Sequence, residues 1–206
     1  MKLLPLAGLA AAAMLSTIAI TDALWQGFVV GTPPPWNWEG GHDWMIAGMN
    51  FGDAAAYLLL AVVLMQIEPR LDSGGFTRWV RRLLVVTFGL FAAMTLWGLI
   101  TGATAESLGV FEIGTTILFF ALLILPIMLG FALLRQRQLR LPAILLAGSI
   151  VPFILMMLLG ELTTFAHPAY AEAMALFGIA LLPFALDSVQ APVARLITVE
   201  QQPARA

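Results

Sequence analysis

The stretch WMIAGMNFGDAAAYLLLAVVLMQI, residues 44–67, has the length and composition of a helix that crosses a bilayer, apart from one carboxylate near its middle. A membrane span needs about 20 mostly apolar residues, and this stretch provides them. A carboxylate inside a span costs at least about 2.5–3.5 kcal/mol and normally faces the interior of the helix bundle. We therefore predict a membrane helix that turns Asp53 toward its neighbours.

The rest of the chain shares this apolar character. Of its 206 residues, 61% are hydrophobic and 11% are charged, and the mean hydropathy is +0.94. Soluble domains carry about 25% charged residues, so lipid is the solvent that suits this composition. We predict an all-α, polytopic integral membrane helical bundle. Its six predicted transmembrane helices cover residues 3–24, 44–67, 83–101, 108–134, 141–162 and 169–187.

These six spans are predicted to form a single transmembrane domain, 1–187, followed by a cytoplasmic tail, 188–206. The tail has two interpretations, a short interfacial helix or a frayed polar end. The first span also resembles a secretory signal, because Lys2 precedes an apolar run, and cleavage would leave five spans. The length of the run and the lack of an A-x-A site before Trp25 favour an uncleaved helix.

The positive charges predict the orientation. All ten lysines and arginines fall on one side of the alternating topology, and such residues mark the cytoplasmic side. We expect both termini in the cytoplasm, in an inner or plasma membrane. The net charge of −2 argues against a nucleic-acid partner. The basic residues are Lys2, Arg70, Arg78, Arg81, Arg82, Arg135, Arg137, Arg140, Arg195 and Arg205.

The opposite, outer half holds most of the acidic residues and both histidines. They are Asp22, Glu39, Asp43, Asp53, Glu106, Glu112, Glu161, Glu172, His42 and His167. Counting from the cytoplasmic boundaries places Asp53 and Glu172 about 8 Å deeper than the other acids within spans. Glu172 also suits a structural role, since it follows Pro168 in a first helical turn. Asp53 has a structural alternative too, an interhelical hydrogen bond in its protonated form.

Helical periodicity gives the second span two separate faces. Asn50, Asp53 and Tyr57 fall within an arc of about 60°, which makes a polar stripe. Gly48 and Gly52 form a small-residue seam suited to a partner helix. If the outer ends converge, a proton or a cation would relieve repulsion between the carboxylates. The predicted ligand-binding or proton-coupling residues are Asp53, Asn50, Tyr57, Glu112, Glu161, Glu172, His167 and Trp97.

The outer loop GTPPPWNWEGGHDW, residues 31–44, combines three prolines with three tryptophans. One interpretation is an aromatic belt at the membrane interface. The other is a lid, in which Trp36, Trp38 and Trp44 fold over the outer vestibule and contact a ligand.

Several chemistries are excluded by composition. The chain has no cysteine, and its only lysine is Lys2, so thiolate chemistry and a retinal Schiff base have no attachment site. Two histidines on one side cannot hold a transmembrane pair of haems. No G-x-S-x-G or phosphate-binding loop is present. His42 and Asp43 are metal-ligand types without a metal-site spacing, so we expect no metal and no cofactor.

Three functions remain open. The favoured one is a binding or transport protein that accepts a small cationic or amphipathic ligand from the outer side, with Asp53 as counter-charge or proton-coupling group. The second is a non-catalytic membrane subunit or scaffold of a larger complex. The third is an intramembrane lipid or isoprenoid isomerase or cyclase, in which a carboxylic acid donates a proton. Whether the chain is an enzyme is left undecided by its sequence.

Overall fold

The computed structural model describes residues 3–29, 32, 34–36, 41–71, 74–101, 109–160 and 162–200, with side chains up to residue 187 except those of 69, 101 and 109–112. The fold is all-helical, with 87% of residues in helices and no strand in these ranges. The elements are α1 (Leu3–Phe28), α2 (Asp43–Gln66), α3 (Glu68–Leu71), α4 (Gly75–Thr101), α5 (Gly109–Leu133), the 3₁₀ turn η2 (Arg137–Leu139), α6 (Arg140–Gly148), α7 (Ile150–Leu159) and α8 (Ala169–Glu200).

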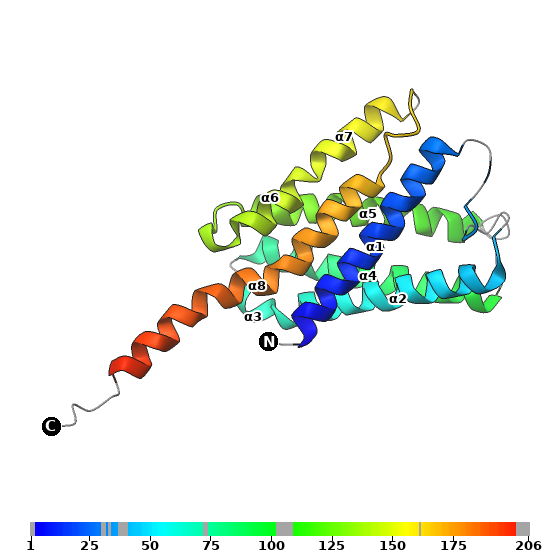
Figure 1. The fold of residues 1–206 in the computed structure, drawn as a ribbon. Coiled ribbons are helices and arrows are strands. Elements are labelled where there is room, and N and C mark those ends of the chain that lie inside the picture. Colours follow the sequence, from blue (N-terminus) through cyan, green and yellow to red (C-terminus); the bar gives the residue numbers. More distant parts are fainter. Residues whose placement is uncertain are drawn as a thin grey trace.

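Six helical segments are long and apolar enough to cross a membrane, which confirms the predicted fold class and is consistent with an integral membrane protein. Five of them are the single helices α1, α2, α4, α5 and α8. The remaining segment combines η2, α6 and α7, which are separated only by a break at Ser149. The last helix does not end with the span, because α8 continues to Glu200 and extends well beyond the other helices (Figure 1).

The helices cross in two groups. In Figure 1, α1, α8 and the α6–α7 pair run in one direction across the view, and α2, α4 and α5 run in another. α8 packs between α1 and α6 and also touches α2 and α5. It has the largest share of buried residues of the six spans, so it is the central helix of the bundle.

The two ends of the bundle differ in charge and packing. We call the end where α1 and α4 begin and α2 and α5 end the arginine end, because every described arginine lies there. Arg70 pairs with Asp187 at 2.6 Å, and Arg81, only 1% exposed, pairs with Glu68 at 2.8 Å. These ion pairs join α3 to α8 and to α4. Which side of a membrane this end faces stays a prediction.

The apolar core lies in the half of the bundle next to the arginine end. Leu64, Leu84, Leu129 and Ile179, from four different helices, are fully buried there. In the opposite half, which we call the cavity end, α7 has no buried residue along its length. Because the helices pack closely at one end and diverge at the other, space is left between them at the cavity end.

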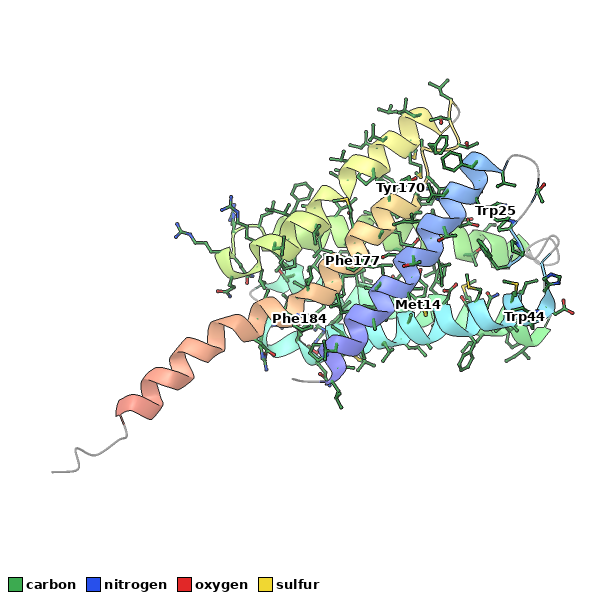
Figure 2. The ribbon with its side chains drawn as sticks, viewed as in Figure 1. Met14, Trp25, Trp44, Tyr170, Phe177 and Phe184 are labelled. Carbon is green, nitrogen blue, oxygen red and sulfur yellow. The ribbon has the colours of Figure 1, made fainter. Side chains whose placement is uncertain are left out.

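The small-residue seam of α2 packs partly within the chain. A Cβ added at Gly52 would lie 3.4 Å from the Met14 side chain of α1, where α1 passes α2 (Figure 2). Gly48 has nothing within 4 Å of the same position. A partner helix at Gly48 therefore stays a prediction.

Candidate functional site

A cavity of about 330 Å³ lies among α1, α2, α4, α5 and α8 at the cavity end. Ligand pockets in proteins span roughly 300–1,000 Å³, so this one suits a small molecule. Its lining is Leu15, Ile18, Ala19, Asp22, Trp36, Met49, Asn50, Asp53, Tyr57, Phe91, Phe119, His167, Pro168, Ala169 and Glu172.

A hydrogen bond between α2 and α8 closes the inner end of the cavity, which we call its floor. The Tyr57 hydroxyl donates to Oε1 of Glu172 at 2.6 Å, and Tyr57 is only 4% exposed. The rings of Phe88 and Phe91 pack against the Tyr57 ring at 5.7 and 5.0 Å. Beyond this pair, toward the arginine end, there is a second pocket of only about 10 Å³.

Asp53 lies one helical turn from Tyr57 on the cavity side. Its charge interacts electrostatically with both Tyr57 and Glu172, so the three groups are close together. The Asp53 Oδ1 atom is buried and accepts no hydrogen bond from any residue that the structure describes. A buried carboxylate oxygen without a donor is costly, and a cationic ligand would reduce that cost.

The cavity wall adds one more carboxylate and an imidazole. Asp22 of α1 accepts a hydrogen bond from Gln26 at 2.8 Å. His167, just before α8, accepts the Ala169 backbone N–H on its Nδ1 at 3.2 Å. Burial lowers the pKa of His167, and the negative charge of Asp22 opposes this effect only in part. His167 is therefore a neutral acceptor at neutral pH.

Aromatic rings complete the lining, and one of them comes from the outer loop. Trp36 packs edge-on against Trp25, with ring centroids 5.7 Å apart, and Trp25 in turn donates from its indole to the Thr32 carbonyl at 2.9 Å. The His42 N–H donates to the Pro35 carbonyl at 3.0 Å. These contacts hold the described part of the loop against α1, with Trp36 in the cavity wall.

The structure thus brings together five of the eight predicted ligand-binding or proton-coupling residues, and Trp36 of the predicted lid joins them. The five are Asn50, Asp53, Tyr57, His167 and Glu172. Asp22, which the depth count placed less deep than Asp53 and Glu172, also lines the cavity, as do Phe91 and Phe119. Nothing in the sequence distinguishes these two phenylalanines from the other apolar residues of their spans.

The other predicted residues do not line the cavity or cannot be placed. Trp97 is 54% exposed on α4, and Trp44 is 74% exposed. Trp44 lies at the start of α2 (Figure 2). Glu161 and Trp38 lie outside the described residues, as does the side chain of Glu112. His42 and Asp43 are exposed, and no group of three or more potential metal ligands occurs in the part of the chain that the structure describes.

The lowered pKa of His167 gives a prediction for acid stability. Above pH 6.5, the ordinary value, the folded and unfolded chains both hold a neutral imidazole, so pH has no effect through this residue. Below it the unfolded chain binds a proton that the folded chain resists, and stability is lost as the pH falls. In His167→Gln this loss is absent. We expect the melting temperature in detergent to fall less between about pH 7 and about pH 5 than in the wild type.

The exposed His42 provides the matched control, since His42→Gln should keep the acid sensitivity of the wild type. An equal fall in melting temperature for wild type and His167→Gln would contradict the prediction.

Comparison with known proteins assigns no function to the chain. No protein-family model, curated protein or solved structure gives a significant match. What the cavity does is therefore inferred from its own residues.

Proposed function

We propose that this chain is a membrane binding or transport protein that takes a small organic cation into the cavity. The observation that carries the proposal is the lining itself. Asp22, Asp53 and Glu172 share the cavity with four aromatic rings, and none of its lining residues is a lysine or an arginine. Carboxylates attract a cation, and ring faces bind alkylated ammonium groups through cation–π contacts.

The spacing of the acidic groups favours an organic cation over a metal ion. The three carboxylates come from three helices, and no described set of three potential ligands converges closely enough to hold a metal. A metal ion needs several oxygen or nitrogen ligands at short distances. An organic cation spreads its charge and its apolar surface over a larger volume, which suits a cavity that mixes carboxylates with rings.

The closed floor supports loading from the cavity end. Beyond Tyr57 and Glu172 lie the pocket of about 10 Å³ and the apolar core. If the arginine end faces the cytoplasm, as the positive charges predict, the ligand arrives from outside. Transport would additionally require the floor to open and the ion pairs Arg70–Asp187 and Arg81–Glu68 to separate.

The lining supports binding over the alternative of an isomerase or cyclase. A general acid for apolar chemistry works in an apolar pocket that excludes water. The cavity around Asp53 instead combines apolar residues with the polar groups of Asn50, Asp22, His167 and Glu172.

Choline and dimethylbutanol, its uncharged isostere, provide the direct test. They have the same shape and differ in the charge, so calorimetry on the purified protein in detergent isolates the electrostatic contribution. We expect choline to bind at least about tenfold more tightly, because the carboxylates and rings act on its charge. Equal affinities, or binding of acetate in place of choline, would refute the proposal.

A further inference from the structure

We infer that a cation entering the cavity displaces a proton held by the two carboxyl groups of Asp53 and Glu172, so that binding at this site is an exchange. The inference rests on the proposed function and adds that a proton leaves the site when the cation binds. The two carboxyl groups belong to α2 and α8 and both line the cavity, with Glu172 bound to Tyr57 at the floor and Asp53 one helical turn from Tyr57. We call them the floor pair.

The Tyr57 hydroxyl serves one member of the floor pair, Glu172, and leaves Asp53 without its hydrogen. Tyr57 donates its only hydroxyl hydrogen to Glu172 at 2.6 Å, and Asp53 lies close enough for its charge to interact with both. The buried Oδ1 of Asp53 has no donor among the described residues. The floor pair is therefore poorly supplied with donors for two negative charges.

The charged groups that face the floor pair do not neutralise its negative charge either. Apart from the hydroxyl of Tyr57, the titratable groups that the described part of the chain places around it in the cavity are Asp22 on α1 and His167 before α8. Asp22 is acidic, and burial lowers the pKa of His167, which favours the neutral imidazole. Two carboxylates sharing a buried site repel each other, and a single proton relieves the repulsion.

A bound cation would relieve the same repulsion, so the proton and the cation are alternatives. The pocket of about 10 Å³ beneath the floor pair, lined by apolar residues such as Phe88 and Leu176, has room for about one water molecule. An organic cation cannot pass that level and stops where the proton is held. In the exchange an O–H bond of the floor pair breaks, the proton leaves to cavity water, and the carboxylate keeps the electron pair beside the cation. The net charge of the site is unchanged.

Choline tests the exchange because its quaternary nitrogen carries no proton, so any proton released must come from the protein. Binding enthalpies are measured at a pH of about 6.5 in buffers that differ in ionisation enthalpy. The slope of binding enthalpy against buffer ionisation enthalpy gives the number of protons released. We expect roughly 0.5–1 proton released per choline bound by the wild type. The same measurement on Asp43→Asn, a change at an exposed aspartate of α2 away from the cavity, should give the same number.

Glu172→Gln separates proton release from binding. It removes one charge of the floor pair and leaves Asp53 to bind the cation, so we expect choline affinity within about tenfold of wild type and no proton release. Wild-type binding without release at every pH from about 5.5 to about 8 would overturn the exchange and leave the proposed function intact. Release that persists in Glu172→Gln would also overturn it. Failure of choline to bind the wild type would remove the proposed function and the exchange with it.

Discussion

Asp53→Asn is expected to weaken choline binding by at least about thirtyfold, roughly 2 kcal/mol. Asparagine keeps the shape of the side chain and removes its negative charge. Loss of one partner from a buried charge pair costs about 2–5 kcal/mol. Asp53 is the residue for which this cost should be largest, because its Oδ1 is buried without a donor in the described chain. Calorimetric titration with choline measures the change.

The same helix provides the control. Asp43 is the other aspartate of α2, is exposed, and does not line the cavity, so Asp43→Asn should bind choline like the wild type. Asp53→Asn should also fold, because the neutral side chain removes a buried charge from the span. A folded Asp53→Asn protein with unchanged choline affinity would show that the carboxylate is not the counter-charge, and the proposed site would then be wrong.

The fold could be predicted from the sequence because it depends mainly on where apolar runs occur along the chain. Runs of apolar residues give six spans, and a backbone in lipid must satisfy its own hydrogen bonds as helices. Prolines within a span indicate kinks, and the break at Ser149 between α6 and α7 lies three residues before Pro152, which has no N–H to donate to the Gly148 carbonyl. The residues around the break are apolar on both sides, so hydropathy contains no signal for it.

The candidate site was predicted only in part, for a related reason. Periodicity indicates which residues share a face of one helix, as with Asn50, Asp53 and Tyr57, and all three line the cavity. It does not indicate which helices become neighbours. The contact between Tyr57 and Glu172 joins residues 115 positions apart, and the inclusion of Asp22 depends on α1 packing beside α8. Those pairings are tertiary, and a single sequence contains no pattern that reveals them.

The close contact of Gly130 on α5 with the backbone of α6 gives the second large prediction. A Cβ built there would overlap the backbone nitrogen of Ala147 and lie 2.7 Å from the carbonyl carbon of Leu146, both on α6. Backbone atoms cannot rotate away as a side chain can, so Gly130→Ala must push the two helices apart. Overpacking of this kind costs about 1–3 kcal/mol, and we expect a value near the upper end. The melting temperature in detergent should fall by roughly 6–12 °C.

The effect should also reach the cavity, because α6 lies between α5 and α8. The Leu146 side chain is 2.7 Å from where a Cβ of Gly178 on α8 would be. Because α6 and α8 are this close, a displacement of α6 must also displace α8. Choline affinity should therefore fall together with stability, since α8 holds Glu172 at the floor. Gly89→Ala is the matched control, a glycine inside α4 with nothing within 4 Å, where alanine should leave the melting temperature unchanged or raise it. Equal melting temperatures for Gly130→Ala and Gly89→Ala would show that the close contact between α5 and α6 does not exist. The inference that α6 positions α8 would then be wrong.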